Sequence, residues 1–148
     1  MREIVVLITD LDRAVCPMQL QQSWLGPNTD CPPNLIFRIA VREVESWLLA
    51  DHEAMKALFG QNVRLSPEPD ALPDPKQFLL DLARRAPRSI RNDLVAEHGA
   101  NAKQGLGYNA RLVQWVKSEW SPERAETRSP SLRRARAALR AASLSLGN

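Results

Sequence analysis

The chain has 148 residues, of which 44% are hydrophobic and 25% charged, and this balance is typical of one globular domain rather than a disordered or fibrous protein. No apolar run approaches the roughly 20 residues that span a bilayer, and the N-terminus leaves no room for a signal peptide, so we expect a cytoplasmic protein. The net charge of +3 is small but uneven, because six arginines lie in the segment 121–148. We therefore expect a single domain over 1–148 with a basic helical tail at 121–148 that has an anionic partner.

Two cysteines, Cys16 and Cys31, stand beside prolines in loop-like sequence. A domain of this size can fold by burial without a disulfide, so we expect both to be free thiols. A zinc site would need four ligands, and only His52 and His98 could join the cysteines, at scattered spacings. We do not expect zinc.

Two apolar runs predict neighbouring parallel strands. The run 4–8 is rich in β-branched residues, too short for a helix and apolar on both faces, like a strand inside a parallel sheet. The run 35–41 follows a loop, and residues 18–25 can form a helical crossover between the two strands. This is a βαβ unit, so the predicted fold class is α/β with a small parallel sheet.

The rest of the chain has helical periodicity. An apolar stripe runs from Val44 to a helix stop at Gly60, and Asp51 on it is expected to cap a second helix that begins at His52. The alternative is that Asp51 turns toward a site. Further helices are predicted after Asp74, near 90–97, around 112–116 and from Ser129 onward.

Two basic features could bind an anion. The last helix directs its apolar residues inward and four arginines outward, and these form either a solvated face or a phosphate contact with DNA or RNA: Arg133, Arg134, Arg136 and Arg140. Lys76 begins its helix, where it is a plain surface lysine or reaches an anion gathered at the strand ends. The four tryptophans are expected in the core, with a partner interface as the alternative: Trp24, Trp47, Trp115 and Trp120.

Asp10 and Asp12 follow the first predicted strand. Parallel sheets bind ligands at the carboxyl ends of their strands, and side chains two apart on an extended backbone point the same way. Both carboxylates can therefore converge on a hard cation such as Mg²⁺ or Mn²⁺. The alternative is an ordinary turn with an Asx cap.

Glu43 and Glu45 follow the second predicted strand, whose carboxyl end lies at the same edge of the sheet. They fall on opposite sides of the helical stripe, so a regular helix cannot aim both at one ion and one must lie in the strand-to-helix turn. We favour Glu45 as the residue in this turn and hence as the third ligand, with Glu43 as the fourth candidate. Plain solvated glutamates are the alternative.

The sequence resembles a known family at these positions. Segments 8–13, 38–51, 74–76, 120–125 and 129–132 are similar to an uncharacterised bacterial domain-of-unknown-function family with a TOPRIM-like fold, related to the nuclease domain of overcoming-lysogenization-defect proteins. The stretch around Trp47 is the distinctive part. The resemblance implies a TOPRIM-like (Rossmann-like) sheet, Mg²⁺-dependent phosphodiester cleavage with Asp10, Asp12 and Glu45 as catalytic residues, and an ATPase partner in anti-phage defence or a mobile element.

The sequence departs from this family in one respect. The TOPRIM pattern has a glutamate on a strand before the Asp-x-Asp strand, whereas this chain begins on the latter, and Glu3 lies about 23 Å from Asp10 along an extended strand. Either Glu43 or Glu45 substitutes, or an upstream segment supplies the glutamate, or the activity is lost. Two strands also make a marginal sheet, which a strand from another chain or from an upstream segment would complete, so a homo-oligomer is among the expectations.

Two other functions are compatible with the sequence. A haloacid-dehalogenase-like phosphatase would use Asp10 as its nucleophile, but position 14 is Ala where that family has Thr or Val. A non-catalytic subunit would bind an ATPase partner or nucleic acid through its tryptophans and basic tail. No glycine-rich phosphate loop is expected, since Gly105 and Gly107 follow no strand.

Overall fold

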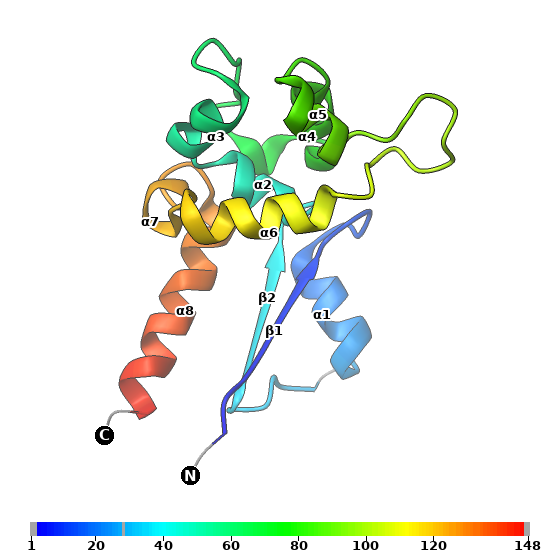
Figure 1. Ribbon diagram of the computed structural model, residues 1–148. Coiled ribbons are helices and arrows are strands. Elements are labelled where there is room, and N and C mark those ends of the chain that lie inside the picture. The colour runs from blue at the N-terminus through cyan, green and yellow to red at the C-terminus, as the bar shows by residue number, and fades with distance from the viewer. Residues whose placement is uncertain (1–2, 28, 147–148) are drawn as a thin grey trace.

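The computed structural model describes residues 3–27 and 29–146 and confirms a mixed α/β fold with about half of the chain in helices (Figure 1). The βαβ unit comes first and the remaining helices follow. The elements are β1 (Val5–Asp10), α1 (Pro17–Leu25), β2 (Leu35–Ala40), α2 (Glu45–Leu49), α3 (His52–Phe59), the 3-10 turn η1 (Pro69–Ala71), α4 (Pro75–Arg84), α5 (Arg88–Leu94), α6 (Tyr108–Ser118), α7 (Pro122–Ala125) and α8 (Pro130–Leu146).

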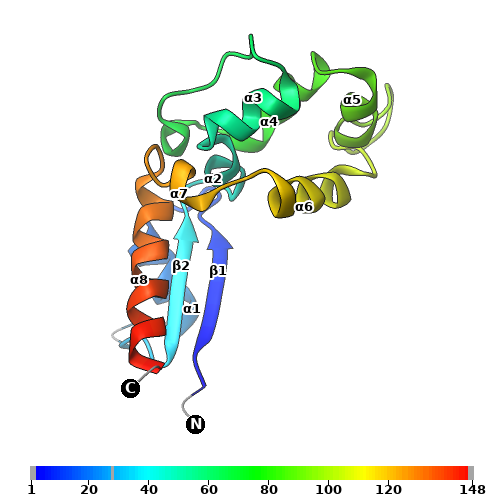
Figure 2. The same cartoon turned by 60° about the vertical axis from the view of Figure 1, so that its left-hand side comes forward.

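The sheet consists of β1 and β2, which pair in parallel from Val5 opposite Leu35 to Asp10 opposite Ala40, as the two apolar runs predict. The helices α1 and α8 cover opposite faces of this pair. The ring of Phe37 contacts Trp24 of α1, with 5.6 Å between ring centroids, whereas Ala40, three residues on, packs against α8. Figure 2 shows α8 running alongside β2 and β1 on the side away from it.

The expectation that β1 is buried on both faces is wrong. Val5, Val6 and Ile8 are 51%, 46% and 47% exposed, because β1 is an edge strand and α8 packs over β2 instead. The helix α1 has no buried residue, and Trp24 on it is 54% exposed, so this tryptophan is not in the core as predicted. The N-terminal unit is therefore only partly covered.

Most of the hydrophobic core lies among the helices. The larger cluster is formed by the helices from α2 through α6. It is centred on the fully buried side chains of Leu79 and Leu94 and includes Trp115, as expected. A smaller cluster joins β2, α2, α7 and α8 around Trp47, whose indole N–H donates to Ser131 Oγ at 2.7 Å. No helix of the described residues is long and apolar enough to cross a membrane.

The caps at the helix starts match the sequence signals. Asp74 accepts a hydrogen bond from the Gln77 N–H at the start of α4, and Ser129 Oγ accepts one from the Leu132 N–H at the start of α8. The hydroxyl of Ser131, two residues on, accepts the hydrogen bond from the Trp47 indole N–H. Asp70 ties η1 to α8 by accepting from Ser129 Oγ at 2.7 Å and from the Ser131 N–H at 2.9 Å.

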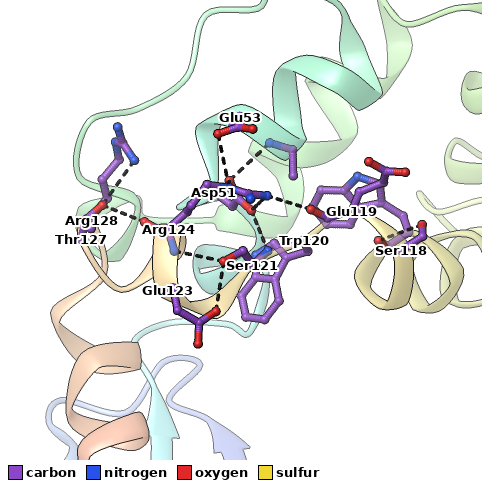
Figure 3. A network of polar contacts seen from close by, with 12 residues as sticks. Asp51, Glu53, Ser118, Glu119, Trp120, Ser121, Glu123, Arg124, Thr127 and Arg128 are labelled. Carbon is purple, nitrogen blue, oxygen red and sulfur yellow. Dashed lines mark hydrogen bonds and ion pairs between the residues drawn. The ribbon is translucent and has the colours of Figure 1, made fainter.

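Asp51 divides the long apolar stripe into α2 and α3, and its role as a cap is confirmed. Its fully buried carboxylate accepts from the backbone N–H groups of Ala54 and Ser121, at 3.3 and 2.7 Å. The Arg124 guanidinium donates to both of its oxygens, from Nε at 2.9 Å and from Nη2 at 2.8 Å (Figure 3). These donors all belong to the chain, so the carboxylate holds α7 to the start of α3 rather than facing a site.

The ionised form of Asp51 is the stable one. Burial acts to raise the pKa of this carboxyl, but the hydrogen bonds from Arg124, Ser121 and Ala54 outweigh it and lower the pKa below its ordinary value. A carboxylate with a lowered native pKa contributes stability above its unfolded pKa of about 3.9 and loses that contribution as the pH falls through the native value.

We expect Asp51→Asn to lower the free energy of unfolding by about 2 kcal/mol at pH 7, because it removes the charge from these hydrogen bonds. The matched control is Glu53→Gln, since Glu53 is 78% exposed and also pairs with Arg124, at 3.6 Å. It should change stability by less than about 0.5 kcal/mol. Urea denaturation measures both, and the Asp51→Asn deficit should shrink as the pH falls below 4. Equal effects of the two variants would contradict this role.

Candidate functional site

The carboxyl ends of β1 and β2 leave the sheet side by side, and this brings Asp10 to the start of the helical half. Pairing continues past the strands, because the Leu11 N–H donates to the Ala40 carbonyl at 2.9 Å and the Asp12 N–H to the Arg42 carbonyl at 2.7 Å. The Val44 N–H then donates to Asp10 Oδ1 at 2.7 Å. One oxygen of Asp10 is thus held in place by the backbone that leads into α2.

Asp12 does not continue the strand. Its backbone is left-handed, with φ of 49°, and so is that of Arg42, with φ of 65°. The argument from strand alternation therefore does not apply to Asp12, because the extended backbone ends at Asp10. Asp12 instead lines an open pocket of about 500 Å³ together with Arg13, Arg42, Glu43 and Pro73.

Glu43 lies in the turn between β2 and α2, so the expectation that Glu45 is the glutamate in this turn is wrong, because α2 already begins at Glu45. Its Oε2 accepts a hydrogen bond from the Lys76 N–H at 2.8 Å, in the first turn of α4. Glu43 is therefore not a plain solvated glutamate. The bond links the strand-to-helix turn to a helix more than thirty residues further along the chain.

Glu45 is the first residue of α2 and is buried, with 6% of its surface exposed. Its Oε1 accepts a hydrogen bond at 2.8 Å from the hydroxyl of Tyr108, the first residue of α6. The Lys76 ammonium lies over the Tyr108 ring, 5.2 Å from its centroid. Lys76 is thus close to the acidic residues, and a cation–π contact is attractive because the face of the ring is negative.

Charge repulsion shows that these carboxylates share one region. Burial raises the pKa of Asp10, the Val44 N–H lowers it, the charges of Glu45 and Asp12 raise it further, and Lys76 lowers it. Burial likewise raises the pKa of Glu43, as do the charges of Glu45, Asp74 and Asp10, while the Lys76 N–H lowers it. The net shift is upward in both groups. The structure therefore brings together Asp10, Asp12, Glu43, Glu45 and Lys76 at one rim.

The rim fits a hard cation in its chemistry but is not a complete metal site. In Asp10, Glu43 and Glu45, one carboxylate oxygen accepts a hydrogen bond from the protein. Among the described residues we find no hydrogen bond to the other oxygen. Such donors orient carboxylates for ligation. However, no group of three or more His, Cys, Asp or Glu within 3–27 and 29–146 is arranged to hold an ion.

The arginines of α8 are not a uniform outer face. Arg136 is largely buried and forms ion pairs with Glu123 and Glu126, and Arg140 lies 3.7 Å from Glu126. Arg133 donates to the backbone carbonyl of Glu126 at 3.0 Å. Three of the four arginines predicted to contact phosphate thus bond to carboxylate or carbonyl groups of the chain itself. Arg134 is exposed, and no contact of its side chain is found in the described part of the chain.

Tyr108 is the site residue that sequence reasoning missed. The chain before it passes so close to α5 that a Cβ on Gly105 would lie 2.4 Å from the carbonyl oxygen of Asp93, which only glycine permits. The Gly105 N–H donates to the Leu94 carbonyl at 2.9 Å. The glycines at 105 and 107 were a signal of close packing rather than of phosphate binding, and this packing positions Tyr108.

Comparison of the chain with protein-family models, with curated proteins and with solved structures gave no match. The TOPRIM-like resemblance accordingly stays a prediction.

The phenol of Tyr108 should report on the rim, because it is the single tyrosine of the chain. Burial raises its pKa well above the ordinary value near 10, and so do the charge of Glu45, the hydrogen bond to Glu45 and the charge of Glu43, in that order. Glu45→Gln should therefore lower this pKa clearly and Glu43→Gln only slightly. Phenolate absorbance against pH measures it, with circular dichroism to confirm folding. Wild-type titration near pH 10 would contradict the contact.

Proposed function

We propose that this chain is a TOPRIM-like, Mg²⁺- or Mn²⁺-dependent phosphodiesterase of the nuclease type, with its metal on Asp10 and on Glu43 or Glu45. The observation that carries the proposal is that Asp10, Glu43 and Glu45 meet at the carboxyl ends of β1 and β2, each with one oxygen held by a protein donor. Burial raises the pKa of Asp10 and the charges of Glu45 and Asp12 raise it further, so like charges repel one another at the rim. A bound cation would relieve this repulsion, and carboxylate oxygens are the ligands that Mg²⁺ and Mn²⁺ prefer.

The hydrogen bonds at the rim support a ligand role for these carboxylates. Val44, Lys76 and Tyr108 each donate to one carboxylate oxygen and so fix the orientation of the group. Donors of this kind are typical partners of metal-bound carboxylates. Asp12, which lines the neighbouring pocket, would attract the ion by its charge.

The substrate is proposed to complete the site. Mg²⁺ is usually held by one or two carboxylates together with substrate phosphates, so an incomplete set of protein ligands is compatible with such a mode. When bound, the metal polarises the phosphoryl group and activates water. Lys76, whose charge lowers the pKa of Asp10, is proposed to bind a substrate phosphate beside it. We further propose that the protein acts in the cytoplasm with an ATPase partner, in anti-phage defence or a mobile element.

A second candidate is a non-catalytic subunit that binds an ATPase partner or nucleic acid. It is favoured by the finding that the described residues contain no group of three ligands arranged for an ion. The two candidates differ in whether the rim binds a metal at all.

We expect Mn²⁺ or Mg²⁺ to bind weakly at the rim, and Asp10→Asn to lower the affinity about tenfold or more. The amide oxygen of Asn can still accept from Val44, so the fold should persist. Glu97→Gln is the control, because it removes an exposed carboxylate in the loop after α5. Isothermal titration calorimetry measures both, and affinity should fall as the pH drops through the raised pKa values of Asp10 and Glu43. Unchanged affinity in Asp10→Asn would refute the metal site.

We expect this 148-residue chain alone to cleave DNA little or not at all with Mg²⁺ or Mn²⁺, because cleavage by two metals needs more ligands than the rim supplies. A complex with its ATPase partner, or a form with a further strand that ends in glutamate, should cleave and should lose cleavage on Asp10→Ala or Asp12→Ala. Robust cleavage by this chain, abolished by Glu45→Ala, would show that the second strand supplies the missing carboxylate. Hydrolysis of an aryl phosphate without nuclease activity would instead indicate a phosphatase.

A further inference from the structure

The outer edge of β1 has backbone groups without partners in the described chain. In a parallel pair every second residue of a strand bonds to its neighbour, and here the Val5 N–H donates to the Asn34 carbonyl at 2.8 Å. The same alternation directs Leu7 and Thr9 toward β2. The N–H and carbonyl groups of Val6 and Ile8 consequently point away from β2, and no hydrogen bond to them is found in residues 3–27 and 29–146.

The side chains along this edge are apolar and half exposed. The side chains of Val6 and Ile8 lie on the same face of the sheet as α8. Because α8 covers β2 and not β1 on this face, these two side chains are 46% and 47% exposed. The strand has no charged residue or proline before Asp10. Exposed edge strands normally carry such residues because they block pairing with another chain. This edge has none of these protections.

We propose that this edge is a self-association surface, on which β1 of a second copy pairs antiparallel with β1. The result is a continuous four-stranded sheet in the order β2, β1, β1 of the partner and β2 of the partner. A two-fold axis at Leu7 sets Val6 of each copy opposite Ile8 of the other. Both residues have their backbone groups directed outward, so each such pair exchanges two backbone hydrogen bonds.

Charge selects the antiparallel orientation of a second copy. Around a two-fold axis at Leu7, Asp10 of one copy lies opposite the uncharged Ile4 of the other. A parallel arrangement in register would instead place Asp10 beside Asp10, and like charges on adjacent strands destabilise pairing. The antiparallel arrangement also joins Val6 and Ile8 of both copies into one row of β-branched side chains, which favour cross-strand contacts. The strand is thus complementary to itself.

The test is the mass of the protein in solution over a concentration series, measured by sedimentation equilibrium. We expect a concentration-dependent dimer of twice 16.6 kDa. Hydrogen exchange at the amides of Val6 and Ile8 should slow as the dimer fraction rises, while exchange at Val5 and Leu7, already bonded to β2, should change little. A monomer at every soluble concentration would overturn the proposal.

Two variants locate the interface. Ile8→Lys should raise the dimer dissociation constant about tenfold or more, because each copy contributes one charge to the interface. Val113→Lys, on a residue of α6 that is 54% exposed, is the control and should leave dimerisation unchanged. If Ile8→Lys does not fold, Val6→Lys is used on the same criterion, with circular dichroism to monitor the fold. A dimer that persists in the lysine variant, or whose Val6 and Ile8 amides are unprotected, would refute pairing through β1. Metal binding at the rim is measured separately, so neither outcome decides the proposed function.

Discussion

The buried carboxylate of Asp51 is the contact on which the arrangement of this chain most depends. It ends the stripe of α2, caps α3 and accepts from the Ser121 N–H and from Arg124, some seventy residues later. This fixes α7, and through α7 the start of α8, which then packs over β2. The Arg124 side chain is 38% exposed, but the Asp51 carboxylate is fully buried, and such a group stabilises the fold only because both of its oxygens are well supplied with donors. Loss of one partner would weaken the attachment of α7 to the start of α3, while α8 keeps its own contacts with Trp47 and Asp70.

The environment of the rim has the opposite effect on its carboxyl groups, because the pKa of Asp51 is lowered whereas those of Asp10 and Glu43 are raised. Among the described residues, Asp10, Glu43 and Glu45 each accept one hydrogen bond, whereas Asp51 accepts several, and the neighbours of Asp10 and Glu43 are largely other acids. A group with a raised native pKa contributes stability below its unfolded pKa and loses it as the pH rises through the native value, so ionised Asp10 and Glu43 cost stability at neutral pH. The fold tolerates this cost at one edge of the sheet, and shifted carboxyl groups of this kind are a feature of functional sites.

The sequence predicted local features well and their surroundings less well. Both strands, the crossover, the cap at Asp51 and the start of α8 follow from short-range periodicity and cap chemistry, which depend on neighbouring residues. The prediction that β1 and Trp24 are buried was wrong, because burial depends on which helix packs on which face of the sheet, and α8 packs over β2. The contacts of Glu45 with Tyr108 and of Glu43 with Lys76 join residues more than thirty positions apart, and no periodicity encodes such pairs.

The exposed strand β1 ends at Asp10, so the least covered part of the sheet leads directly into the acidic rim. Asp10 is the last residue of β1, whose pairing in the described chain is with β2 on one side only. The other ligand candidates, Glu43 and Glu45, are anchored to α4 and α6, inside or beside the main core. The position of Asp10 relative to them therefore depends on how firmly β1 is held. A strand paired along the outer edge of β1 would restrain Asp10 without touching the rim, so the proposed self-association would steady one carboxylate of the proposed metal site through the backbone of β1.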